Sequence, residues 1–195
     1  MPCPVVVANS KFEDWTAGDL DNWTGPINTG SGSSSWAEAT GESGSALQLS
    51  TQGSGNQLCD AEYYIDGPSN ARRKFVIKVR ANGSYNAIQN VSSILMWRED
   101  SLSIPAGQQQ NNSSLNNVYG TLEITVSPSR TIQDKLTIRL RNNKASGGGF
   151  GPRTDTWDEL YIDFLGPPAV RALNLLRTPS ANLRGADQVL LRAPC

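Results

Sequence analysis

The chain has 195 residues, of which 37% are hydrophobic, and its formal net charge at pH 7 is −1. This length and composition suffice for one domain with its own core and argue against a disordered chain. The nearly balanced charge excludes the basic footprint of a general nucleic-acid binder. The sequence contains no histidine, so the commonest general acid–base group and the commonest zinc ligand are both missing.

Three cysteines, Cys3, Cys59 and Cys195, cannot all pair within one chain, and their separations match no zinc motif. A disulfide between Cys3 and Cys195 would join the two ends, but we favour three reduced thiols in a protein made in a cytoplasm. The N-terminal segment lacks a basic region, and no apolar run approaches the ~20 residues that span a bilayer. We therefore expect neither a signal peptide nor a membrane partner.

Alternation of apolar and polar residues with a period of two predicts a series of β-strands. The predicted strands are Ala46–Thr51, Gln57–Ile65, Phe75–Arg80, Val91–Arg98, Thr121–Ser127, Asp134–Arg141 and Trp157–Leu165. The side chains expected in the core are Phe75, Ile77, Val79, Leu122, Ile124, Leu136, Ile138, Ile162 and Phe164. Those expected to point outward are Val76, Lys78, Arg80, Thr137, Arg139 and Arg141.

Segments rich in Gly, Ser and Asn separate these strands and are typical of turns and loops. They are Gly30–Ser35, Gly41–Gly44, Asp66–Asn70, Pro105–Asn117 and Ala145–Pro152. No helical period appears before residue 168. The sequence thus predicts an all-β protein, a two-sheet antiparallel jelly-roll sandwich over residues 1–166 followed by an extended C-terminal arm over residues 167–195.

Two short motifs near the ends of the predicted domain resemble a known family. The first is Asn9-Ser10-Lys11-Phe12-Glu13, and the second is Tyr161-Ile162-Asp163 in the last strand. Together they resemble the jelly-roll carbohydrate-binding modules attached to xylanases and cellulases, over about residues 8–166. The resemblance implies a structural calcium ion held by Glu13 and Asp163, an ion that prefers six to eight oxygen ligands. The residue after Asp163 is Phe164, where the family pattern has a second Asp.

Sugar binding requires aromatic rings that stack on the apolar faces of pyranosides. Trp36, Tyr85, Trp97 and Trp157 are the candidate glycan platforms. Trp97 lies in the most apolar predicted strand, so a place in the core is the alternative to a role as a platform. Trp157 opens the last predicted strand, and its alternative role is to cap the sandwich.

Catalysis is not expected. Neighbouring acids such as Asp158 and Glu159 point to opposite faces of a strand and cannot clasp one substrate.

The arm contains a repeated motif, in which Leu175-Leu176-Arg177 recurs as Leu190-Leu191-Arg192, each followed by a residue and a proline. A frayed tail or linker would be less apolar than these leucine pairs. We expect Leu175, Leu176, Arg177, Leu190, Leu191 and Arg192 to contact a surface, which is the chain's own sandwich, a sister copy or another protein.

Two hypotheses for function follow. In the first, the chain is a non-enzymatic virion accessory protein, similar to the decoration or cement proteins of tailed bacteriophages, and its arm docks on capsid protein or sister copies. In the second, it is a carbohydrate-binding module or adhesin that recognises a polysaccharide.

Overall fold

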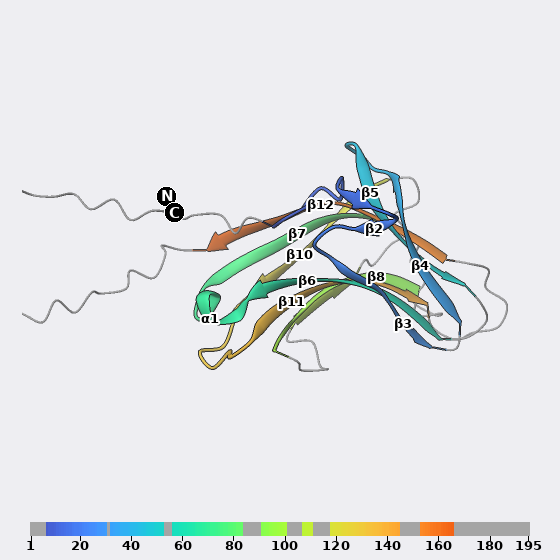
Figure 1. Cartoon of the computed structure of the whole chain (residues 1–195). Helices are drawn as coiled ribbons and strands as arrows, with labels where there is room; N and C mark the ends of the chain where they lie inside the picture. The colour runs from blue at the N-terminus through green and yellow to red at the C-terminus, as the bar shows by residue number, and fades with distance from the viewer. Residues whose placement is uncertain are drawn as a thin grey trace, which may run out of the picture.

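The computed structural model describes residues 7–30, 32–52, 56–83, 91–100, 107–110, 118–144 and 153–165. In this part of the chain two five-stranded sheets lie face to face, as Figure 1 shows. Every strand pairing within the two sheets is antiparallel. Among the described residues, one short helical turn, α1 (Gly67–Asn70), accompanies the sheets. The Asp66 carboxylate caps it by accepting a hydrogen bond from the backbone N–H of Ser69 at 3.1 Å.

The first sheet has the strand order β10-β7-β12-β5-β4. Its strands are β4 (Ser33–Thr40), β5 (Ser45–Gln52), β7 (Lys74–Asn82), β10 (Gly120–Val126) and β12 (Arg153–Leu165). The second sheet has the order β3-β6-β11-β8-β9. Its strands are β3 (Thr24–Gly30), β6 (Gln57–Asp66), β8 (Val91–Glu99), β9 (Gly107–Gln110) and β11 (Lys135–Lys144). A small ribbon of β1 (Trp15–Thr16) and β2 (Asp19–Leu20) precedes both sheets.

From β5 onward nearly every connection carries the chain from one sheet to the other. This alternation interleaves strands that are distant in sequence, so β12 lies between β5 and β7, and β11 between β6 and β8. The result is a jelly-roll sandwich, which confirms the fold predicted from the sequence. All seven predicted strands are present, with ends that differ by up to four residues.

The core fills the space between the sheets, because alternate side chains of each strand point inward. Eight of the nine side chains expected in the core are buried, and the side chain of the ninth, Phe164, lies outside the described set. Aromatic side chains close one side of this core. Trp23 packs between Phe12 and Tyr63, with ring centroids 5.2 and 5.3 Å away.

Two sequence predictions about individual segments were wrong. Gly30–Ser35 was expected to be a loop, yet β3 ends at Gly30 and β4 begins at Ser33, so most of it is strand. Part of the predicted polar loop Pro105–Asn117 forms β9 along the edge of the second sheet. In both places backbone pairing with a neighbouring strand outweighs the low strand propensity of Gly, Ser and Gln.

Val76 and Thr137, which were expected to lie outside, are both buried. Thr137 does lie on the face of β11 opposite Leu136 and Ile138, as predicted. That face, however, is covered by large charged side chains of the second sheet.

Candidate functional site

The face of the second sheet that points away from the core carries a cluster of charged side chains from three neighbouring strands. Asp60 and Glu62 lie on β6, and Arg139 and Arg141 lie directly opposite them on β11. Arg98 joins them from β8, where it pairs with Thr137 of β11. The period of two places Cys59 and Ala61 of β6 on the core side, so the charged residues between and beyond them face outward. The strands of this sheet are arched, with the hollow side away from the first sheet (Figure 1).

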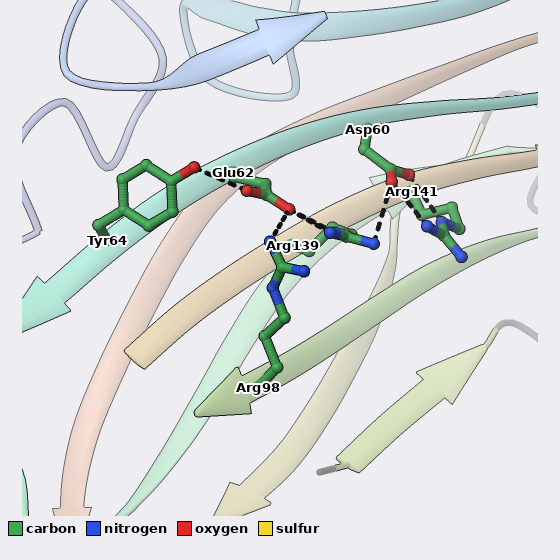
Figure 2. Close-up of polar contacts among 6 residues, drawn as sticks. All are labelled: Asp60, Glu62, Tyr64, Arg98, Arg139 and Arg141. Atoms are coloured by element: carbon green, nitrogen blue, oxygen red, sulfur yellow. Dashed lines mark hydrogen bonds and ion pairs between the residues drawn. The ribbon is translucent and has the colours of Figure 1, made fainter. Parts of the chain in front are cut away.

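We call the six residues Asp60, Glu62, Tyr64, Arg98, Arg139 and Arg141 the arginine ladder (Figure 2). Arg141 donates two parallel hydrogen bonds to Asp60, from Nε to Oδ1 and from Nη2 to Oδ2, both 2.7 Å long. Arg139 bridges both acids, since its Nη1 lies 3.3 Å from Asp60 Oδ2 and its Nε donates to Glu62 Oε1 at 2.7 Å. Arg98 donates to the same Glu62 oxygen at 2.8 Å. The Tyr64 hydroxyl donates to Glu62 Oε2 at 2.7 Å.

The two acids and the three arginines lie at different depths. Asp60 and Glu62 are each 1% exposed, whereas the side chains of Arg139, Arg98 and Arg141 keep 13, 19 and 19% of their surface. The carboxylates therefore lie beneath the guanidinium groups. A molecule that approaches this part of the face can contact the arginines, whereas the carboxylates beneath them are covered.

The electrostatic state of the ladder follows from these contacts. Burial works against ionisation of Glu62, but the hydrogen bonds from Tyr64 and Arg139, together with the charges of Arg139 and Arg98, lower its pKa. Burial, and then the hydrogen bond to Glu62, raise the pKa of Tyr64. Glu62 is thus a carboxylate and Tyr64 a neutral phenol at neutral pH. Each arginine is fixed by an ionised partner, and such charge-assisted pairs hold guanidinium planes in defined orientations.

Tyr64 adds an accessible aromatic ring at one end of the ladder. Its side chain is 37% exposed, and the Lys135 ammonium lies 3.7 Å from the ring centroid. A ring with one face or edge open to solvent can pack against the apolar face of a ligand while its hydroxyl stays bonded to Glu62.

The structure corrects two of the four predicted aromatic platforms, Trp97 and Trp157. Trp157 is fully buried and Trp97 is 5% exposed. The strand register explains this, because Trp157 lies opposite Leu47 and Trp97 opposite Ile138, which both point into the core. Trp36 is half-buried and packs edge-on against Trp15 at a centroid distance of 6.2 Å. Tyr85 lies outside the described residues.

The predicted calcium ligands Glu13 and Asp163 have different described neighbours. Asp163 is exposed on β12 opposite Val76. Glu13 instead lies against Gly44, where its Oε1 is 2.7 Å from the position that a Cβ atom would take. The same loop contacts Asp158, which lies five residues before Asp163, or roughly 16 Å along a strand.

Asp158 is the buried acid at this place. Its Oδ2 accepts hydrogen bonds from the backbone N–H groups of Glu42 and Ser43, at 2.7 and 3.1 Å. Its Oδ1 is buried and has no hydrogen-bond partner in the described part of the chain. Asp158 therefore fits an additional cation or water, although no group of three or more acids, cysteines or histidines is gathered among the described residues.

The remaining sequence predictions fall partly outside the described residues. Cys59 is a free, buried thiol, and burial raises its pKa to about 11, so it is unreactive at neutral pH. Cys3 and Cys195 lie outside, as do all six arm residues between Leu175 and Arg192. Within the described ranges no helix is long and apolar enough to cross a membrane.

The sequence analysis did not predict that the residues of the arginine ladder lie together. The pattern Asp60-x-Glu62-x-Tyr64 and the pair Arg139-x-Arg141 were visible as polar residues at a spacing of two. This spacing places each set on one face of its strand. Recognising the site would have required knowing that β6 and β11 are neighbours in this register.

Comparisons with known proteins establish the fold. No protein-family model matches the sequence, and no curated protein matches it either. Among solved structures, a Stig cyclase from Fischerella sp. TAU, in complex with (3Z)-3-(1-methyl-2-pyrrolidinylidene)-3H-indole, matches with a TM-score of 0.59 and 12% identity, over 83% of this chain and 97% of its own. The carbohydrate-binding module TmCBM61, in complex with β-1,4-galactotriose, matches with a TM-score of 0.51 and 13% identity, over 84% of this chain and 100% of its own.

The enzymatically active domain of tailspike protein 4 from bacteriophage CBA120 matches with a TM-score of 0.55 and 12% identity, over 82% of this chain. This chain spans only 21% of that tailspike chain. The architecture is therefore that of a jelly-roll β-sandwich. The carbohydrate-binding module TmCBM61 shares this fold, which confirms the fold that the resemblance in the sequence implied. Binding modules and enzymes both occur among the matches, so the fold alone does not assign the function.

Proposed function

We propose that this chain is a non-enzymatic polysaccharide-binding domain, and that the ligand lies along the arched outer face of the second sheet, over the arginine ladder. The observation that carries the proposal is the fixed array of donors formed by Arg98, Arg139 and Arg141. Their carboxylate partners hold the arginine side chains in place before any ligand binds. The side chains therefore lose less conformational entropy on binding. The exposed ring of Tyr64 supplies an apolar contact at the end of the same array.

The comparison with TmCBM61 supports a saccharide as the ligand class, because that module has the same fold and binds a galactotriose. Recognition here relies on hydrogen bonds more than on stacking, since Trp97 and Trp157 are in the core. The test is electrophoresis of the native chain in gels that contain one dissolved polysaccharide each. Retardation in at least one gel, relative to bovine serum albumin, is the expected result, and unchanged mobility in every gel of a broad panel would overturn the proposal.

We further propose that a structural calcium ion is held by Glu13 and Asp158, with Asp158 in place of the Asp163 that the family resemblance implies. Asp158 offers a buried carboxylate oxygen without a partner, and Glu13 lies against the same loop. When bound, the ion would neutralise these acids and tie the loop after β4 to β12. Because a ligand that binds only the folded state stabilises it, EDTA is expected to lower the melting temperature.

The control distinguishes Asp158 from Asp163, the acid that the sequence analysis selected. Asp158→Asn is expected to abolish the EDTA effect, whereas Asp163→Asn should retain it. Identical melting curves with and without EDTA, or an EDTA effect that survives in Asp158→Asn, would contradict the proposed ligand set.

A second candidate function is that of a virion accessory protein of the decoration or cement type. Two observations favour it: the tailspike domain that shares the fold, and the repeated motif of the arm. In this proposal the chain is located in the virion, and Leu175, Leu176, Leu190 and Leu191 anchor it to capsid protein or sister copies, with Arg177 and Arg192 fixing the register.

Removing residues 168–195 tests that second candidate. All described core residues lie between Val7 and Ile162, so the truncated chain should fold with an unchanged far-UV circular dichroism spectrum. It should also fail to join particles that the full chain joins. Incorporation of the truncated chain would contradict the role of the arm, and loss of folding would show that the arm packs on its own sandwich.

A further inference from the structure

We infer that the ligand of the arginine ladder is an acidic polysaccharide, one whose sugars carry carboxylate or sulfate groups. This inference rests on the proposed function and names the substrate class of that same site. It does not follow from the fold, because the solved module TmCBM61 of the same architecture was crystallised with a neutral galactotriose. It follows from how charge is arranged on this face.

The first argument is the charge count. The described charged residues on this face of β6, β11 and β8 are Asp60, Glu62, Asp66, Lys135, Arg139, Arg141 and Arg98, with four positive and three negative side chains. The face therefore carries an excess of one positive charge, although the whole chain has a net charge of −1. The excess is concentrated in the ladder, where three guanidinium groups share two carboxylates.

The second argument is that the arginines of the ladder are more exposed than its carboxylates. The ladder carboxylates are almost completely covered, and among the charged groups of the ladder the arginines keep the exposed surface. A guanidinium group has five N–H donors, and a carboxylate that it holds bidentately uses only two of them. Arg141 donates to Asp60 through Nε and Nη2, and its Nη1 has no acceptor in the described part of the chain. These remaining donors suit an anionic oxygen, which accepts stronger hydrogen bonds than a neutral hydroxyl does.

The third argument is the contrast with the outer face of the first sheet. There Arg80 pairs with Glu42, and Lys78 pairs with Glu123, so each described ion pair contains one cation and one anion. The depth order is also reversed. The Glu42 and Glu123 side chains are 46 and 51% exposed, more than Arg80 at 29% and Lys78 at 39%. In these two pairs the acid is the more exposed partner, the reverse of the ladder, and the Arg80–Glu42 pair is a matched control for the ladder.

The test compares three polymers in native affinity gels: polygalacturonate, which carries carboxylates, dextran sulfate, which carries sulfates, and neutral xylan. Retardation by at least one of the two acidic polymers, with weakening in 0.5 M NaCl as expected of charge pairing at about a 4 Å Debye length, is the predicted result. The polymer that retards the chain identifies which acidic group is recognised. The Arg141→Gln variant should bind that polymer roughly tenfold more weakly, as expected for the loss of one charge-assisted contact. Arg80→Gln should bind like the unaltered chain.

Each other outcome has a defined meaning. Retardation by xylan without retardation by either acidic polymer would overturn this inference and leave the proposed polysaccharide function standing. Absence of retardation by all three, extended to a broad panel of neutral polymers, would overturn both. Equal weakening by Arg80→Gln and Arg141→Gln would show that the acidic polymer binds by diffuse charge and not at the ladder. If Arg141→Gln fails to fold, as judged by circular dichroism, the comparison of polymers and salt with the unaltered chain still decides the inference.

Discussion

Replacing Glu62 with alanine is expected to lower the free energy of unfolding by about 3–5 kcal/mol, the usual cost of removing one partner from a buried ion pair. Glu62 is 1% exposed and accepts hydrogen bonds from Arg98, Arg139 and Tyr64. Without it, the guanidinium groups of Arg98 and Arg139 lose the carboxylate that both contact. Since whole domains are stable by only about 5–15 kcal/mol, this change should be evident in urea denaturation.

The matched control is Glu42→Ala, which removes the partner of Arg80 on the opposite face. Glu42 is exposed, so its loss should leave the denaturation midpoint almost unchanged. A Glu62→Ala chain with the midpoint of the unaltered chain would contradict the account of the ladder as a buried, mutually dependent network.

The pH dependence of stability gives an independent test of the contribution of Glu62. Contacts with Tyr64, Arg139 and Arg98 lower the pKa of Glu62 below its ordinary value of 4.5 despite burial. The stabilisation from its ionised form is thus present above pH 4.5 and is lost as the pH falls through the lowered pKa. In Glu62→Ala this part of the acid destabilisation should be absent.

Replacing Trp157 with alanine is expected to cost about 3–5 kcal/mol of folding stability, as for large aromatic side chains removed from a core. Trp157 has no exposed surface and lies opposite Leu47 and Ala81 in the centre of the first sheet. The change would leave a cavity that the surrounding strands, held by their hydrogen bonds, cannot close completely.

Tyr161→Ala is the control for Trp157→Ala, because Tyr161 lies on the same strand and is 48% exposed. Its replacement should shift the melting temperature by much less. Comparable shifts for the two variants would contradict the placement of Trp157 in the core, and would reopen its role as a glycan platform.

The fold was predictable from the sequence wherever one face of a strand is apolar. β7 and β10 alternate so regularly that their inward residues, such as Phe75 and Leu122, followed from spacing alone. β3 and β4 were missed because their sequences, TGPINTG and SSSWAEAT, carry few apolar residues and lie at a sheet edge. There, pairing with β6 and β5 determines the strand, and such pairing is not encoded locally.

The candidate site was predictable only in its components. Period two placed Arg139 and Arg141 on the outer face of β11, and that placement was correct. Their partners lie about 80 residues earlier, since the bonds from Arg141 to Asp60 and from Arg139 to Glu62 span 81 and 77 positions. Burial of Trp157 could not be deduced either, because an irregularity between Asp158 and Leu160 shifts the alternation of β12 and turns Trp157 to the same face as Leu160.

Chemical-shift mapping of the isotopically labelled chain with an oligosaccharide from the polysaccharide that retards it tests the central claim most directly. The claim is that ligand binds over the arginine ladder. Titration is predicted to shift the Nε–H signals of Arg98, Arg139 and Arg141 and the ring signals of Tyr64, and to leave Arg80 and Tyr161 on the opposite face unchanged. Shifts confined to Arg80 and Tyr161, or saturable binding that leaves the ladder signals in place, would contradict it.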